Sequence, residues 1–208
     1  MEQPRSLRQK KDAAAKRALY EAAMDLFRKK GYESTSVEEI ADQAGFSRAS
    51  FFNHFGTKDG VLRYYGQQLL ETIERLLEDR DHAMSPMELI RLIIFTMAKE
   101  ASRRRSEVRF ILKYSGYDKN YLVSPTPSRA RIWAILALLV LQCQEQRLIR
   151  DDIPAKDIVL HMLSVYHGMV WAIVSENSDV ELLLNSSWNF IMGGMSGEGA
   201  GTTRHNKR

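Results

Sequence analysis

The sequence has a single cysteine, Cys143, so the chain cannot form an internal disulfide. A protein without disulfides suits a reducing compartment such as the cytoplasm. Long apolar runs are also missing. The longest, residues 132–141, is too short for a membrane-spanning helix of roughly 20 residues, and the N-terminus has no apolar signal region. We therefore expect a cytoplasmic protein with no membrane segment.

Patterns that would indicate an enzyme are missing as well. The chain has no glycine-rich phosphate loop, no cysteine, histidine and carboxylate cluster at metal-ligand spacing, and no recognisable nucleophile and base. His161 and His167 are six positions apart, which does not place them on one helix face as a metal-binding pair. We expect no catalysis, no metal site and no cofactor, and a helical enzyme is only a remote alternative.

Alternation of apolar and polar residues, which is typical of half-buried strands, is absent over any useful length, and helical spacing dominates. Residues 15–27 carry apolar side chains at i, i+3 and i+4, and Gly31 follows as a helix end. A capping box for a second helix is predicted by Thr35 or Ser36 with Glu38 or Glu39 three positions on. The sequence therefore predicts an all-α fold.

Further helix starts follow the same rules along the chain. Ser47 is placed to cap a short helix that ends near Phe55, and Thr57 to cap the next one. Ser85, Pro86 and Glu88 form a strong start before a helix that is apolar nearly all round. Other segments are then expected in this order: a loop over 115–127, a helix over 128–146, a helix after Pro154 and a helix capped near Asp179.

Positive charge is concentrated at the N-terminus. Residues 1–30 contain nine lysines and arginines against four acids, a net charge of +5, whereas the whole chain carries only +4. A basic segment that leads into a helix pair favours binding to phosphates over a merely solvated tail.

The helix pair itself is the most informative feature. Residues 36–41 and 47–58 read as two short helices joined by a tight turn at Gly45, with a polar and basic second helix. This is the arrangement of a helix-turn-helix, which places its second helix in the major groove of DNA.

Residues 17–62 closely resemble the DNA-binding domain of tetracycline-repressor-type (TetR family) transcriptional regulators. The matching features are Ala22-Ala23, Leu26-Phe27, Gly31-Tyr32, Thr35-Ser36-Val37, Ile40-Ala41, Ala44-Gly45-Phe46-Ser47, Phe51, His54-Phe55, Thr57-Lys58-Asp59 and Leu62. The resemblance implies a three-helix helix-turn-helix domain joined to a larger helical domain that binds a ligand and dimerises. The expected limits are a basic flexible arm over 1–12, the DNA-binding domain over 13–60, the larger domain over 61–193 and a disordered tail over 194–208.

Two positions depart from the family pattern. Phe52 stands where the family usually has a tyrosine whose hydroxyl meets a phosphate, and Ala49 stands where a small residue, often glycine, is usual. Loss of this hydroxyl is expected to weaken binding to the DNA backbone by about 1 kcal/mol. Phe51, Phe52 and Phe55 are all expected in the core.

Candidate DNA contacts follow from side-chain chemistry on this motif. Arg48 is the best candidate for a bidentate bond to guanine, and Asn53 for a bond to adenine or a phosphate. His54 and Lys58 are expected at phosphates. The full set is Thr35, Ser36, Ser47, Arg48, Ser50, Asn53, His54 and Lys58.

Candidate residues for a mostly apolar ligand are drawn from the aromatic and sulfur side chains of the larger domain, each of which is also compatible with plain core packing. They are Phe95, Met97, Phe110, Tyr114, Trp133, Tyr166, His167 and Trp171. The last two helices are expected to form a four-helix bundle with a second copy, because a single recognition helix reads too few base pairs. The candidate interface is Ile158, Met162, Val165, Met169, Leu182, Leu183, Ser186, Asn189 and Phe190.

The predicted function is that of a repressor that binds palindromic double-stranded DNA as a homodimer and is released by a small-molecule effector. An activator or architectural regulator that needs no ligand is the main alternative, and the sequence does not separate the two.

Overall fold

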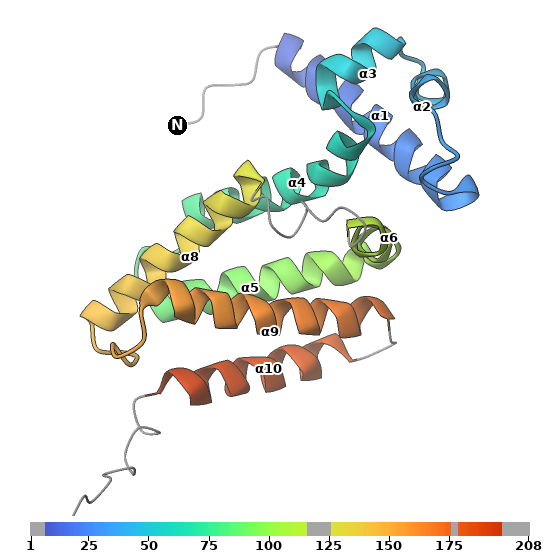
Figure 1. Cartoon of the computed structure of the whole chain (residues 1–208). Coiled ribbons are helices and arrows are strands. Elements are labelled where there is room, and N and C mark those ends of the chain that lie inside the picture. The colour runs from blue at the N-terminus through green and yellow to red at the C-terminus, as the bar shows by residue number, and fades with distance from the viewer. Residues whose placement is uncertain (1–6, 116–125, 176–178, 197–208) are drawn as a thin grey trace, which may run out of the picture. The chain divides into compact units, whose positions relative to one another are not determined.

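In the computed structural model, residues 7–115, 126–175 and 179–196 are described, and within them the chain forms nine α-helices and no strand (Figure 1). The helices are α1 (Leu7–Lys30), α2 (Val37–Ala44), α3 (Arg48–Phe55), α4 (Lys58–Glu78), α5 (Pro86–Arg103), α6 (Arg105–Ser115), α8 (Pro127–Glu145), α9 (Ala155–Ser175) and α10 (Val180–Met195). The predicted all-α fold is confirmed.

The helix ends show where local sequence rules held. Ser36 with Glu39 and Ser85 with Glu88 form the two predicted capping boxes, and the Thr57 hydroxyl accepts a bond from the amide of Gly60 in the first turn of α4. Residues 7–12 belong to α1, so the prediction of a flexible arm is wrong for them, while residues 1–6 lie outside the described part. Residues 116–125 of the loop predicted over 115–127, and residues 197–208 of the tail predicted over 194–208, also lie outside it. The ends of both predictions are wrong, because Ser115, Pro127, Gly194 and Met195 belong to helices.

The chain divides into two compact units. Of the described residues, the first unit holds 7–68 and 110–115, and the second holds 69–109 and those from 126 onward. This division differs from the expected limit near residue 60, because the C-terminal part of α6 packs with the N-terminal helices. Both α4 and α6 contribute residues to each unit.

Aromatic side chains form much of the core of the first unit. The Phe110 ring of α6 stacks on Phe27 of α1, with ring centres 5.5 Å apart, and the Tyr114 ring lies tilted against Tyr32, also at 5.5 Å. Phe27 and Phe51 are fully buried at the centre of this cluster. These rings hold α1, α3 and the end of α6 together.

The turns of the first unit are tight because glycine occupies the critical positions. Gly45 has φ of +74° and ends α2 in the left-handed conformation, which glycine adopts without strain. A Cβ on Gly60 would lie 2.0 Å from the Phe55 carbonyl oxygen. Only glycine therefore lets α4 begin so close to the end of α3.

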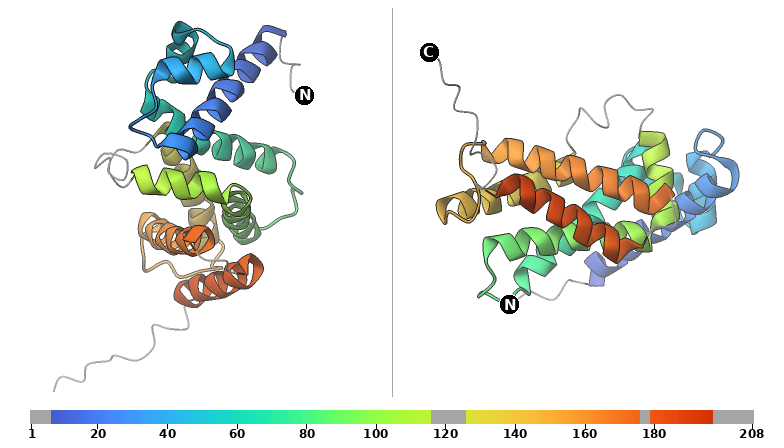
Figure 2. Two further views of the ribbon diagram at one scale, coloured as in Figure 1. Left: turned by 90° about the vertical axis from the view of Figure 1, so that its right-hand side faces the viewer. Right: turned by 90° about the horizontal axis from the view of Figure 1, so that it is seen from below.

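The second unit is a helical bundle (Figures 1 and 2). In it α5 and α9 contact each other, and each of them also contacts α8 and α10. Ile90 and Ile93 of α5, Leu136 of α8 and Ile173 of α9 are buried in its core. Among the described residues, α9 alone has the length and apolar composition of a membrane-spanning helix. Nine of its residues, Met162 among them, are buried, as in the core helix of a bundle.

Two leucines of α8 provide a test of this packing. Leu136 is fully buried, whereas Leu138 is 58% exposed. Leu136→Ala removes apolar contacts and leaves a cavity, so it should lower the free energy of unfolding by about 2–5 kcal/mol. Leu138→Ala should change it by less than about 0.5 kcal/mol. Urea unfolding followed by circular dichroism measures both, and equal losses would contradict the assignment of the buried face.

Candidate nucleic-acid interface

The helix pair α2–α3 presents one side of α3 to solvent. Gly45 turns the chain, and the Ser47 hydroxyl caps α3 by accepting the amide of Ser50 at 3.1 Å. Phe51 and Phe55, one helical turn apart, face the core. The opposite side of α3 therefore carries the exposed residues Arg48, Ala49, Phe52 and Asn53.

The predicted contacts divide according to this geometry. Arg48 and Asn53 lie on the exposed side, and Ser47 lies at the start of the same helix. Ser50 is half-buried beside them. Ser47, Arg48 and Ser50 lie at the N-terminal end of α3, the end that enters a major groove in helix-turn-helix proteins, and Asn53 lies further along the helix. The role of these four residues stays a prediction.

Three predicted contacts lie elsewhere. Thr35 is 2% exposed, and its hydroxyl donates to the Gly31 carbonyl at 2.8 Å, so its side chain is not offered to a ligand. The His54 side chain is only 11% exposed, with Nδ1 3.8 Å from a carboxylate oxygen of Asp12 in α1. Both side chains, which the motif assigned to DNA, are therefore engaged in contacts within the first unit.

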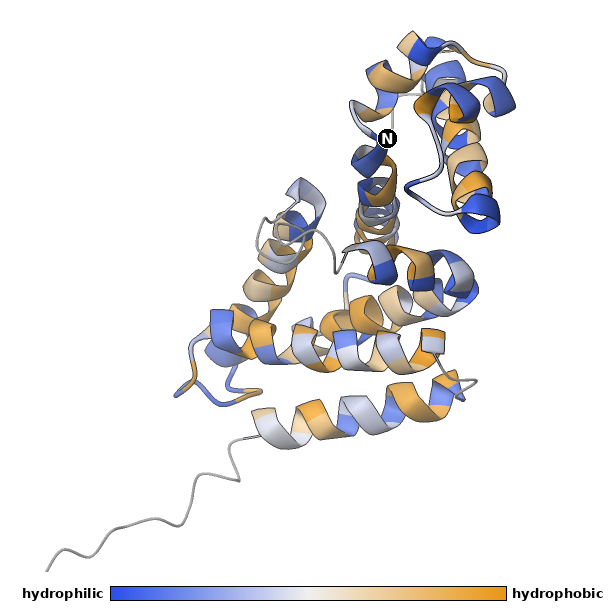
Figure 3. Ribbon diagram, turned by 45° about the vertical axis from the view of Figure 1, so that its right-hand side comes forward, coloured by the Kyte–Doolittle hydropathy of each residue, from blue (hydrophilic) through white to orange (hydrophobic). Residues whose placement is uncertain are grey.

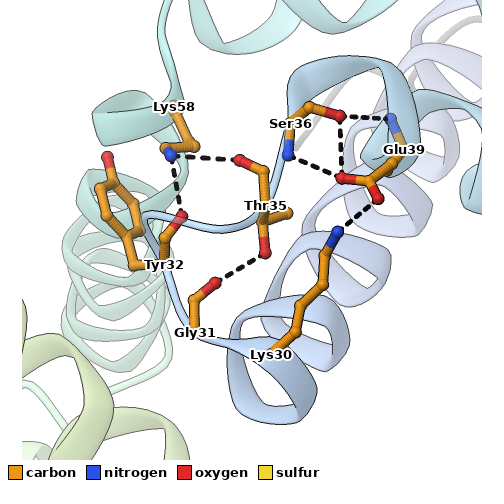
Figure 4. Close-up of polar contacts among 7 residues, drawn as sticks. All are labelled: Lys30, Gly31, Tyr32, Thr35, Ser36, Glu39 and Lys58. Atoms are coloured by element: carbon orange, nitrogen blue, oxygen red, sulfur yellow. Dashed lines mark hydrogen bonds and ion pairs between the residues drawn. The ribbon is translucent and has the colours of Figure 1, made fainter.

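Lys58 is also used within the unit (Figure 4). Its Nζ donates to the backbone carbonyls of Tyr32 and Thr35, at 2.8 and 3.1 Å, and lies 4.3 Å from the centre of the Tyr32 ring. The ammonium thus ties the first residue of α4 to the turn between α1 and α2. A DNA phosphate that bound Lys58 would have to share its ammonium with these two carbonyls.

Ser36 and Glu39 close the N-terminus of α2 next to this turn (Figure 4). The Ser36 hydroxyl accepts the Glu39 amide, and the Glu39 carboxylate accepts the Ser36 amide and hydroxyl and pairs with Lys30 of α1. The Lys30 ammonium first, and then the Ser36 donors, lower the pKa of Glu39 from 4.5 to about 2. Ser36 is exposed, but its hydroxyl serves the cap.

Phe52 was expected in the core, and that prediction is wrong. Its side chain is 39% exposed, with the ring edge-to-face against Phe51 at 5.7 Å and beneath the guanidinium of Arg48 at 5.3 Å. The exposure of Phe52 could have been predicted from the spacing of Phe51 and Phe55. Residues at i and i+4 lie on one face of a helix, and when these two occupy the buried face, position 52 lies outside it.

The predicted ligand residues do not gather at one place. Phe110 and Tyr114 belong to the aromatic cluster of the first unit, and Trp171 is exposed on α9. Ligand binding by these three residues stays a prediction. Of the others, Met97 and Tyr166 are buried, Phe95 and Trp133 are half-buried, and His167 lies on the exposed side of α9.

The predicted dimer residues fall on two different faces. Ile158, Met162 and Met169 are buried within the second unit, and Val165 and Leu183 are half-buried, so the stripe chosen on α9 is the inward one. Leu182, Ser186, Asn189 and Phe190 of α10 are exposed. Leu160 and Trp171 are the large apolar residues on the exposed side of α9. Neither was predicted at the interface, because the stronger apolar stripe of α9 faces inward.

Reactive and metal-binding groups are few. The described residues contain no group of three or more histidine, cysteine and acidic side chains that could hold a metal ion. Cys143 is fully buried, and burial raises the pKa of its thiol to about 11. The thiol is therefore protonated and inaccessible near neutral pH.

Comparison with known proteins places the helix-turn-helix in a family. Residues 19–65 match the family model described as bacterial regulatory proteins, tetR family. The HTH-type transcriptional repressor Rv3405c of Mycobacterium tuberculosis is 34% identical over 73 residues, which cover 35% of this chain and 37% of the repressor. The match thus spans well under half of that relative's length.

Two solved structures extend the similarity beyond the first unit. The FadR repressor of Thermus thermophilus, solved in complex with lauroyl-CoA, is 26% identical with a TM-score of 0.59, over 90% of this chain and 98% of that one. The fatty acid degradation regulator FadR of Bacillus halodurans has a TM-score of 0.70 over 86% of this chain and 95% of that one. Its 14% identity shows a shared fold alone.

The lowered pKa of Glu39 predicts a pH-dependent stability. A carboxylate whose folded pKa lies below its unfolded value stabilises the fold above the unfolded value and loses this effect as pH falls through the folded one. The advantage of the wild type over Glu39→Gln should therefore be complete above about pH 5 and should vanish as the pH falls from 4.5 toward 2. Thermal denaturation across that range measures it. Lys30→Met should reduce the same advantage, and a difference that is independent of pH would contradict the assignment.

Proposed function

We propose that this chain, which belongs to the TetR family of bacterial regulatory proteins, is a ligand-responsive repressor that binds a palindromic operator in double-stranded DNA as a homodimer. The observation that carries the proposal is the exposed side of α3, a capped, glycine-bounded helix on which Arg48 stands at the start and Asn53 further along the same side. A regulator acting on DNA in a bacterium works in the cytoplasm, and no catalytic role is proposed for the chain.

Base reading is assigned to Arg48 and Asn53. The guanidinium of Arg48 matches the O6 and N7 acceptors of guanine, and the amide of Asn53 matches the N7 acceptor and N6 donor of adenine. Ser47 and Ser50 supply short hydroxyls at the same helix end. Ser36 and the basic N-terminal helix α1 are assigned to the DNA backbone, where a positive segment contributes affinity for any sequence.

We assign a supporting role beneath this surface, and no DNA contact, to Thr35, His54 and Lys58. Each makes its described interaction inside the first unit, through the Gly31 carbonyl, Asp12, or the Tyr32 and Thr35 carbonyls. Their loss should disturb the position of α2 and α3 before it removes any bond to DNA.

The effector is proposed to be small and mostly apolar, bound in the second unit. The Thermus FadR structure contains lauroyl-CoA, and an acyl chain suits a bundle whose core residues are almost all apolar. The candidates that remain in this unit are Phe95, Met97, Trp133, Tyr166 and His167.

Helix α6 offers a route from effector to DNA. Within the second unit, Nε of Arg109 donates to the Val174 carbonyl near the end of α9, at 2.6 Å. The next residue, Phe110, stacks on Phe27 of α1 within the first unit. A ligand that favours one position of α9 would act on α6, and α6 on the aromatic cluster. Coupling of this kind requires the ligand to bind one conformation more tightly than the other.

The homodimer is proposed to form through the exposed faces of α9 and α10. These faces combine the large apolar side chains of Leu160, Trp171, Leu182 and Phe190 with small or polar residues such as Ser186 and Asn189. Figure 3 shows hydrophobic and hydrophilic residues interspersed along α10. Large exposed apolar groups on neighbouring helices are typical of a protein interface, and two helices from each copy make a four-helix bundle.

Selection of bound DNA from a random pool tests the proposed function. The full-length protein should select a palindrome, and salt should weaken the binding. Arg48→Ala should reduce the preference for one guanine in each half-site by about 1–3 kcal/mol, the value of a bidentate contact. Lauroyl-CoA, as an acyl probe, should weaken operator binding; if neither it nor a cell extract does so, the chain acts without a ligand. Failure to select any sequence would refute the proposal.

The dimer surface is tested separately. Phe190 is 73% exposed, so Phe190→Asp should not disturb the core of one subunit. It should convert the dimer to a monomer at micromolar concentration and abolish high-affinity binding to the palindrome, because a monomer reads one half-site. Analytical ultracentrifugation and operator titration measure the two effects. Leu138→Asp, at an exposed position of α8, is the control and should leave the dimer intact.

A further inference from the structure

The Arg48 side chain is held by two neighbours on different helices. Its Nε lies 2.7 Å from Oε1 of Glu38, in the first turn of α2. Its guanidinium carbon lies 5.3 Å from the centre of the Phe52 ring, one turn further along α3. The carboxylate thus fixes an edge of the guanidinium and the ring supports its face.

Glu38 is free of the capping role that its neighbour performs. Glu39 closes the capping box with Ser36 and pairs with Lys30. Glu38 pairs instead across the turn with Arg48, and both side chains of this pair are more than half exposed. The two adjacent carboxylates therefore have separate partners, one between α1 and α2 and the other between α2 and α3.

The geometry of the pair leaves a defined edge of the arginine for a ligand. The printed contact of the pair runs to Nε, which lies on one side of the planar guanidinium. Guanine presents O6 and N7 in the major groove as a pair of acceptors. A guanidinium held at Nε is oriented to meet such a pair with its two terminal amino groups, and less of its side-chain freedom remains to be lost on binding.

We propose that Glu38 is a specificity-determining positioning residue that holds Arg48 for an end-on contact with guanine, with Phe52 as the platform beneath it. This inference rests on the proposed DNA-binding function. A carboxylate close to DNA opposes binding to every sequence, because it adds to the phosphate charge. Glu38 therefore lowers affinity for DNA in general and raises preference for one base.

These opposite effects make the inference testable with three variants of the full-length protein. Glu38→Ala removes the support, and Glu38→Gln keeps an acceptor oxygen but removes the charge. Asp42→Ala is the matched control, because Asp42 is an exposed carboxylate one turn further along α2. Arg48→Ala identifies the base position concerned, as the one at which it removes the guanine preference.

The measurements are titrations of the selected operator, of operators with the guanine replaced, and of a random duplex at fixed salt. Glu38→Ala should lower the guanine preference by roughly three- to tenfold and raise affinity for the random duplex by roughly twofold. Glu38→Gln should lie between wild type and Glu38→Ala. Asp42→Ala should raise affinity for the random duplex and keep the guanine preference.

Several results would overturn the inference. One is a Glu38→Ala protein with the wild-type base preference, measured where Arg48→Ala loses it; this result leaves the proposed function intact. Another is an equal loss on every sequence, random duplex included, which thermal denaturation would trace to misfolding of α2. A wild-type chain that selects no sequence at all would instead refute the proposed function.

Discussion

The arrangement of the first unit depends most on the contacts made by the Lys58 ammonium. It binds the carbonyls of Tyr32 and Thr35 and lies against the Tyr32 ring, so the start of α4 is joined to the residues that precede α2. α2 begins two residues after Thr35, with Ser36 as its cap. The direction of the helix pair is therefore set by the Lys58 ammonium, which binds backbone carbonyls within the unit.

A second constraint acts at the other end of the helix pair. α4 begins against the Phe55 carbonyl, where Gly60 leaves no room for a side chain. α3 is thus held between the turn at Gly45 and the close approach at Gly60, while Phe51 and Phe55 anchor it from below. The exposed side chains of α3 are supported by backbone geometry, which a single surface substitution does not alter.

Local rules predicted much of this structure, because the interactions behind them lie within a few residues of one another. The Ser36 and Ser85 capping boxes and the end of α2 at Gly45 are of this kind. The destinations of long side chains could not be predicted in the same way. Phe110 packs against Phe27, which is far away in the sequence, and a lysine at a helix start can bind either a phosphate or a carbonyl.

The candidate site shows the same division. The placement of Arg48 and Asn53 on α3 followed from the motif, whereas the pairing of Arg48 with Glu38 required the turn between two helices to be known. The apolar stripe on α9 was found correctly as a stripe, but Met162 and its neighbours could equally face a partner or the core of their own bundle. Tertiary packing settles which.

The pairing of Arg48 with Glu38 also bears on how such a protein moves through a bacterial chromosome. In the free protein, the carboxylate partly cancels the field of the one arginine on the exposed side of α3. Weak attraction to random DNA shortens each visit to a wrong site, and the time spent on wrong sites limits the search for a rare target. Under the proposed reading role of Arg48, the acidic residue beside it thus lowers affinity for random DNA and shortens the search for the target.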